Sequence, residues 1–138
     1  MKIFLDATIL VSVLNKEYPV FTYSSRILSL ADNKKFEVFT SPICLAIAFY
    51  FAEKKSGNAL ARKKIEILSN NLSIADSTQL VVRKTNKNKQ IHDFEDGLEY
   101  YSALQSNCKC IITEDESDFY FSEIEVLNSR DFLVKYMM

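Results

Sequence analysis

The chain has 138 residues, of which 48% are hydrophobic and 12% aromatic. This length predicts a single domain over residues 1–138 with its own core, and the composition excludes an intrinsically disordered chain. No apolar run reaches the roughly 20 residues that cross a bilayer, so we expect a cytoplasmic protein without a membrane segment. The net charge of −1 does not by itself indicate nucleic-acid binding.

The predicted secondary structure runs strand, helices, strand, helices along the chain. Strands are predicted at residues 2–6, 36–39, 72–75, 109–113 and 125–127. Helices are predicted at residues 8–15, 20–32, 42–55, 59–70, 77–86, 93–106 and 129–135, with a loop at 85–90. The helix at 42–55 is apolar nearly all round, which predicts deep packing. This order predicts an α/β fold, a three-layer α/β/α sandwich with a mainly parallel central sheet.

Three groups of acidic residues, far apart in sequence, follow predicted strands or begin a predicted helix. Asp6 ends the first strand, and the other two groups lie in residues 92–104 and 111–121. Parallel α/β sheets place their ligands at the carboxyl ends of the strands, where all three groups can meet. Carboxylates gathered there indicate a site for a hard divalent cation.

Each of these features also has a purely structural interpretation. Asp93 and Asp96 resemble a helix capping box, and acids on a first turn complement the helix dipole. Most acids after the strand at 109–113 are expected to be solvated, with one or two reaching the sheet edge. The basic clusters, including Arg83, Lys84 and Lys87, are either solvated helix ends or a phosphate-contacting rim around the acids.

Cysteine and histidine usage excludes other chemistries. Cys44, Cys108 and Cys110 are expected to be buried reduced thiols, because no disulfide framework is apparent. His92 is the only histidine, and no serine-centred elbow is present, which argues against Ser-His-Asp and Cys-His mechanisms.

Nearly the whole chain resembles the PIN-domain ribonucleases, a family that includes VapC-like toxins. The resemblance rests on MKIFLD ending at Asp6, TSP at 40–42, DFEDGLEYYSA at 93–103 and IITEDESDF at 111–119. It implies a cation site of Mg²⁺ or Mn²⁺ on Asp6, Asp96 and Asp115, supported by Asp93, Asp118, Thr8 and Thr113. It also implies hydrolysis of RNA phosphodiester bonds, and for such a substrate the basic rim of Arg83, Lys84 and Lys87 is the predicted contact.

The same resemblance implies a protein antitoxin as partner and a homodimer. Tyr100, Tyr101 and Phe121 are candidate aromatic residues for such a dimer interface, and core positions are the alternative for them.

The chain departs from the family pattern at two positions. Thr8 stands where the family usually has an asparagine, and Ile47 stands where it usually has a glutamate. Glu53, the nearest acid on that helix, is about 120° around the axis from position 47 and is not expected to substitute. The alternative to an active ribonuclease is therefore a catalytically weakened or inactive PIN-like module that binds RNA or a protein partner.

Overall fold

Five parallel strands form the centre of the protein within residues 1–137, the part that the computed structural model describes. They are β1 (Lys2–Leu5), β2 (Glu37–Thr40), β3 (Ser73–Ile74), β4 (Cys110–Ile112) and β5 (Glu125–Leu127). Their order in the sheet is β3-β2-β1-β4-β5, and every pairing between neighbours is parallel. The predicted parallel sheet is confirmed.

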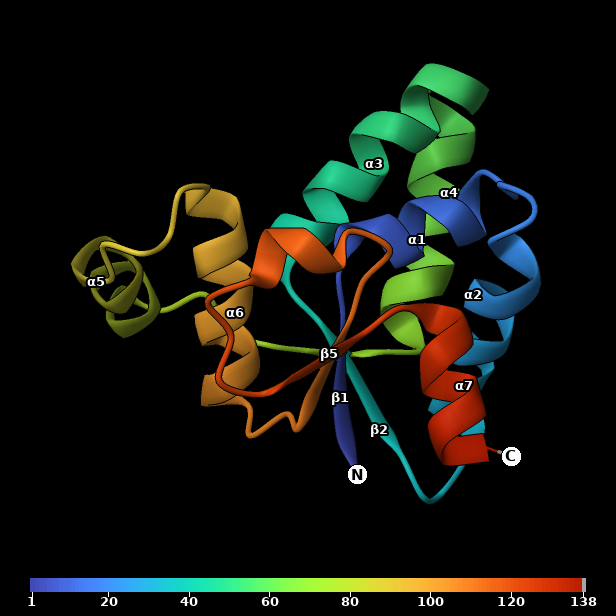
Figure 1. Ribbon diagram of the computed structural model, residues 1–138. Helices are drawn as coiled ribbons and strands as arrows, with labels where there is room; N and C mark the ends of the chain where they lie inside the picture. The colour runs from blue at the N-terminus through green and yellow to red at the C-terminus, as the bar shows by residue number, and fades with distance from the viewer. Residues whose placement is uncertain (138) are drawn as a thin grey trace.

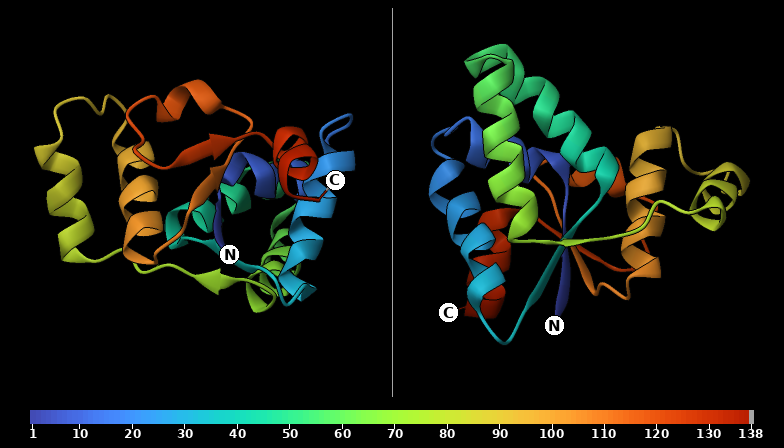
Figure 2. Two further views of the ribbon diagram at one scale, coloured as in Figure 1. Left: turned by 60° about the horizontal axis from the view of Figure 1, so that its bottom comes forward. Right: turned by 180° about the vertical axis from the view of Figure 1, so that it is seen from behind.

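Helices cover both faces of this sheet. They are α1 (Ala7–Leu14), α2 (Phe21–Ser29), α3 (Pro42–Ser56), α4 (Asn58–Asn70), α5 (Gln79–Lys87), α6 (Phe94–Gln105) and α7 (Ser129–Met137), with 3₁₀ turns η1 (Leu30–Asp32) and η2 (Glu116–Phe119). Figure 1 views the sheet nearly edge-on, with α5 and α6 on one side and α2, α4 and α7 on the other. The view from behind in Figure 2 shows the same separation, which confirms the three-layer sandwich.

The interior strands β1 and β4 are apolar along almost their whole length, because both of their faces are covered. Every residue from Ile3 to Leu5 in β1 and from Cys110 to Ile112 in β4 is fully buried. Continuous apolar strands of this kind are typical of parallel sheets between helical layers.

None of the helices in the described part of the chain is long and apolar enough to cross a lipid bilayer.

The prediction that the helix at 42–55 is deeply packed is wrong. Only small side chains of α3 are fully buried, namely Cys44, Ala48 and Ala52, which recur every four residues on one face. Tyr50 and Phe51 are 51% and 44% exposed. Because α3 contacts α1 and α4 through this row of small residues, the helices approach closely and the large rings are left on the outer side.

Both predicted boundaries of α5 also change. Helix α5 begins at Gln79 with Thr78 as its N-cap, two residues after the predicted start at residue 77, and it continues to Lys87 into the predicted loop. It continues because Val81 and Thr85, four residues apart, form a buried face against α6.

Two of the three candidate aromatic residues for a dimer interface lie in the core. Tyr100 and Phe121 are buried, and Tyr101 is half-buried.

Candidate metal centre

Asp6 lies directly beyond β1, where the chain turns into α1. Its backbone N–H still donates to the Ile112 carbonyl of β4 at 3.0 Å, while its carboxylate caps the first turn of α1. The side chain is only 5% exposed. The strand pairing and the cap together fix this carboxylate at the carboxyl edge of the sheet, the upper edge in Figure 1.

Two threonine hydroxyls hold the Asp6 carboxylate in place. Thr8 and Thr113 each donate from Oγ1 to Asp6 Oδ2, at 2.8 and 2.7 Å. The same two hydroxyl oxygens accept from the backbone N–H groups of Glu114 and Asp115, both at 3.0 Å. Thr8 therefore orients both the Asp6 carboxylate and the loop after β4.

The first turn of α6 brings two further acids to the same edge. Asp93 caps the helix by accepting from the Glu95 N–H at 2.9 Å. Burial, followed by the charges of Asp93, Asp118 and Asp6, raises the pKa of Asp96 to about 7. The hydrogen bond to Glu95 shows that Asp93 caps α6, as its structural interpretation predicted. The pKa of Asp96 shows in addition that this side chain lies within the electrostatic influence of Asp6.

Glu99 and Cys44 join Asp6 in the tightest cluster, and neither was predicted as a site residue. Cys44 Sγ donates to Glu99 Oε1 at 2.7 Å, and one ligand atom from each of the three residues lies within 4.8 Å of the other two. Burial first, and then the contact with Asp6, raises the pKa of Glu99 well above its usual value. Burial, followed by the charge of Glu99, likewise raises the pKa of the Cys44 thiol.

The acids after β4 take three different positions. Glu114 turns away from the cluster and accepts from the Ser129 N–H at 3.0 Å, at the start of α7. Asp115 is exposed next to η2, and Asp118 is exposed on η2 itself. Burial, then the charges of Asp115 and Asp6, raises the pKa of Asp118. Asp96 and Asp115 are not members of the tight Asp6, Cys44 and Glu99 group.

No basic side chain compensates these carboxylates within residues 1–137. The one ion pair found in that range joins Lys135 and Glu125, away from the cluster. Buried carboxylates that lack a cationic partner are costly unless a proton or a metal ion neutralises them. Oxygen ligands gathered in this way fit Mg²⁺ or Mn²⁺, which bind to a few carboxylates and retain several waters. The residues present therefore fit a divalent cation.

Ile47 lies one turn after Cys44 on α3 and is half-buried. It lines a hollow of about 330 Å³ whose wall also includes Thr8 and Glu114. Glu53 accepts from Asn58 Nδ2 at 2.7 Å, at the far end of α3. Glu53 therefore does not take the place of an acid at position 47.

Arg83, Lys84 and Lys87 are exposed on α5. The left view of Figure 2 shows α5 and α6 side by side and antiparallel, so the last turn of α5 lies at the same end as Asp93. Lys84 and Lys87 belong to that last turn. These side chains are not among the contacts of the Asp6 cluster, and they lie on α5, which packs against α6.

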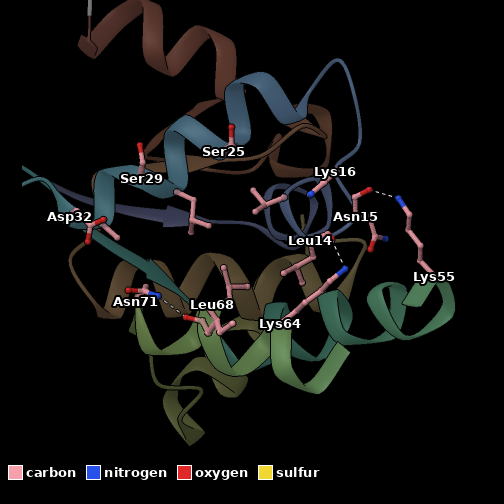
Figure 3. A pocket seen from close by; sticks show the side chains of 14 residues that line it. Leu14, Asn15, Lys16, Ser25, Ser29, Asp32, Lys55, Lys64, Leu68 and Asn71 are labelled. Atoms are coloured by element: carbon pink, nitrogen blue, oxygen red, sulfur yellow. Dashed lines mark hydrogen bonds between the residues drawn. The ribbon is translucent and has the colours of Figure 1, made fainter. Parts of the chain in front are cut away.

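A second hollow, of about 660 Å³, lies between α1, α2 and α4, away from the acids (Figure 3). Its lining includes the apolar residues Leu14, Leu28 and Leu68. Lys64 donates to the Leu14 carbonyl at 3.1 Å, and Lys55 donates to the carbonyl of Asn15. These lysines donate to carbonyl groups at the end of α1 that have no partner within the helix. The described residues that line the hollow include no cluster of carboxylates that could bind a metal ion.

The comparisons with known proteins agree with this fold. A model of the PIN domain matches residues 2–117. Ribonuclease VapC1 from Aquifex aeolicus (strain VF5) is 28% identical over 135 residues, or 95% of this chain and 92% of that protein. The structure of VapBC2 from Rickettsia felis bound to a DNA fragment from their promoter has a TM-score of 0.71 at 21% identity, covering 93% of this chain and 98% of that one. VapBC-1 from nontypeable Haemophilus influenzae has a TM-score of 0.72 at 17% identity, with 94% and 99% covered. Since the family match spans most of its length, the chain belongs to the PIN domain family.

Proposed function

We propose that this PIN domain is a metal-dependent endoribonuclease and the toxin of a toxin–antitoxin pair. The observation that carries the proposal is the pair of carboxylates of Asp6 and Glu99, buried together at the carboxyl edge of the sheet without a basic partner in residues 1–137, with Asp96 within their electrostatic influence. The name of the Aquifex aeolicus relative, a ribonuclease, supports RNA as the substrate.

Asp6, Asp96 and Asp115 are the residues that would hold Mg²⁺ or Mn²⁺. A bound cation polarises a phosphoryl oxygen and neutralises charge that develops during hydrolysis of the phosphodiester. Thr8 and Thr113 keep the Asp6 carboxylate oriented, so it need not reorganise when the substrate arrives. Asp93 and Asp118 add negative charge around Asp96, which favours retention of a cation.

Arg83, Lys84 and Lys87 would contact RNA phosphates beside this centre. They are exposed on α5, whose last turn lies at the end of α6 that carries Asp93. Cationic side chains next to an acidic cation site provide a path for the sugar–phosphate backbone, and such contacts weaken as salt rises.

Cleavage of a pooled set of single-stranded RNAs, with Mg²⁺, Mn²⁺ or EDTA, tests the proposal. We expect cleavage with either ion, none in EDTA, and a loss of about 100-fold or more in Asp6→Asn, since a bound metal contributes several kcal/mol to such a reaction. Asp32→Asn, which removes an exposed carboxylate at η1, serves as the control and should cleave normally. Equal rates for wild type and Asp6→Asn would refute the assignment.

Ile47 favours a second candidate, a PIN module that binds RNA and cleaves it weakly or not at all. An isoleucine provides no ligand atom where the family usually has a glutamate. This candidate predicts that the same RNAs bind to the protein, with an affinity that depends on Arg83, Lys84 and Lys87, while no products accumulate with either ion.

We also propose a protein antitoxin as partner and a homodimer as the assembled toxin. The solved relatives whose fold this chain shares are VapBC structures, which supports a paired protein. Co-expression with the product of each neighbouring reading frame should yield one stable complex in which RNA cleavage is suppressed. Light scattering of the isolated chain should give twice the 15.9 kDa monomer mass.

A further inference from the structure

Helix α3 presents no acid to the candidate metal centre. Ser41, Cys44 and Ile47 stand at intervals of three residues from the cap along α3, and none of them is an acid. The acid on α3, Glu53, is bound to Asn58 at the opposite end of the helix. If a carboxylate stands opposite Asp6 in this protein, it must therefore come from another element.

Glu99 meets that requirement from α6. It follows Asp96 by three residues, which places both side chains on the same face of the helix. Its side chain is only 2% exposed, and its Oε1 atom accepts from Cys44 Sγ, which lies one turn before Ile47 on α3. Glu99 thus reaches across from α6 to the part of α3 where the family's glutamate would begin.

A structural role alone explains this arrangement poorly. A carboxylate so deeply buried is costly unless a charged group or several strong donors compensate it. The donor at 2.7 Å is a thiol, which is a weak donor, and no basic residue in the described range pairs with Glu99. A leucine or methionine would fill the same space without that cost.

The distances suit a shared cation. Two oxygens that bind one Mg²⁺ at about 2.1 Å lie at most about 4.2 Å apart, across the ion. The ligand atoms of Asp6 and Glu99 already lie within 4.8 Å of each other. A small rotation of either side chain brings both within bonding distance of one ion.

We propose that Glu99 is a ligand of the metal ion and replaces the acid that is missing at position 47, with Cys44 orienting its carboxylate. This inference rests on the proposed function, because it adds a residue to the same centre. It makes the centre of this protein depend on α6 for two ligands, Asp96 and Glu99, and on α3 for none.

The test measures Mn²⁺ binding by isothermal titration and by the shift in thermal midpoint, without reference to RNA cleavage. Glu99→Gln keeps the shape of the side chain and removes its charge, and Glu53→Gln makes the same change at the far end of α3. We expect Mn²⁺ affinity to fall about ten-fold or more in Glu99→Gln and to stay unchanged in Glu53→Gln. Glu99→Gln with wild-type affinity for Mn²⁺ would overturn the inference.

A second variant tests the replacement itself. Ile47→Glu in the Glu99→Gln background should recover Mn²⁺ binding, because the acid returns to the position that the family usually uses. Failure of this double variant to bind more tightly than Glu99→Gln would contradict the idea that the two positions serve one ion. If Glu99→Gln does not melt cooperatively, Glu99→Asp takes its place, and its shorter reach should also weaken binding; an unchanged affinity overturns the inference.

The outcomes separate this inference from the proposed function. A wild-type protein that binds no Mn²⁺ refutes the proposed function itself. A wild-type protein whose binding is lost in Asp6→Asn and kept in Glu99→Gln refutes only the role of Glu99.

Discussion

Two helices begin at the carboxyl edge of the sheet beside Asp6, and they contribute very differently to it. Both have a side-chain cap, Ser41 in α3 and Asp93 in α6. At the cap and at the third and sixth positions after it, α3 carries Ser41, Cys44 and Ile47, whereas α6 carries Asp93, Asp96 and Glu99. At these positions α3 has only uncharged side chains, whereas α6 has three carboxylates.

The difference shows that a helix can begin at this edge with a side-chain cap and still contribute no acid to the site. The N-terminus of either helix carries a partial positive charge that favours nearby anions, so both could stabilise acids at this edge. Because α6 alone carries the acids, their charges accumulate within the first two turns of one helix. Burial is the largest cause of the raised pKa of Asp96, and the charge of Asp93 is the next.

Placing a carboxylate on α3 at the position that corresponds to Asp96 should have the largest effect. In Cys44→Asp a third acid enters a fully buried position next to Asp6 and Glu99. Without metal at about pH 8 we expect a loss of about 3–5 kcal/mol in the free energy of unfolding, the cost typical of an uncompensated buried charge.

Mn²⁺ should recover much of that loss in Cys44→Asp and much less in the neutral control Cys44→Asn. Urea unfolding of both variants with EDTA and with Mn²⁺ measures the difference. Equal behaviour of the two variants would mean that position 44 does not face the acidic cluster.

The next effect concerns how α6 is held in place. A Cβ added at Gly97 would lie 2.5 Å from Thr85 Cγ2 and 3.1 Å from two atoms of Ile91. Gly97→Ala gains about 1 kcal/mol in helix propensity, but overpacking of about 1–3 kcal/mol offsets it, so we expect a net loss on the order of 1 kcal/mol.

Thr85→Ser provides the matched background, because it removes the methyl group in question and keeps the hydroxyl that donates to the Val81 carbonyl. In that background Gly97→Ala should cost clearly less. An equal cost in both backgrounds would show that the contact between α5 and α6 is not what requires glycine.

The fold was predictable because its signals are local. Apolar runs of strand length followed by amphipathic segments give the alternation of a parallel α/β sandwich. Asp6 was predictable for the same reason, since a carboxylate directly after the first strand must lie at the carboxyl edge. The Asp93 cap also follows from its position immediately before an amphipathic segment.

Glu99 was missed because its role depends on a contact between two helices that are far apart in sequence. Its spacing of three from Asp96 was visible and places these two side chains on the same side of the helix. No local pattern, however, indicates that Cys44 lies opposite it. The packing of α3 was wrongly predicted for a related reason: hydrophobicity alone did not show that close helix contacts select Ala48 and Ala52 over Tyr50 and Phe51.

The charge on α6 should make the metal-free protein less stable as the pH rises. The pKa of Asp96 is raised from 3.8 to about 7, so between these values the folded protein binds a proton that the unfolded chain has lost. The free energy of unfolding therefore falls as the pH increases from about 4 to about 7. Asp96→Asn should flatten this fall without abolishing it, because the pKa of Glu99 is raised as well. Urea unfolding in EDTA at several pH values measures the slope, and identical slopes for the two proteins would contradict the prediction.

The smallest effect should come from the cap of α6. Asp93→Asn keeps a good capping side chain and removes one negative charge next to Asp96. The loss of a favourable interaction with the helix dipole opposes the relief of repulsion, so we expect the free energy of unfolding to change by no more than about 0.5 kcal/mol. The pKa of Asp96, followed by NMR titration of its carboxyl carbon, should nevertheless move down towards its usual value. Ser41→Ala provides the contrast: it should cost about 1 kcal/mol through loss of the α3 cap and leave the Asp96 titration in place. If Asp93→Asn left the pKa of Asp96 where it is, burial and the charges of Asp118 and Asp6 would account for the shift, and the crowding of charge on α6 would not be what distinguishes the two helices.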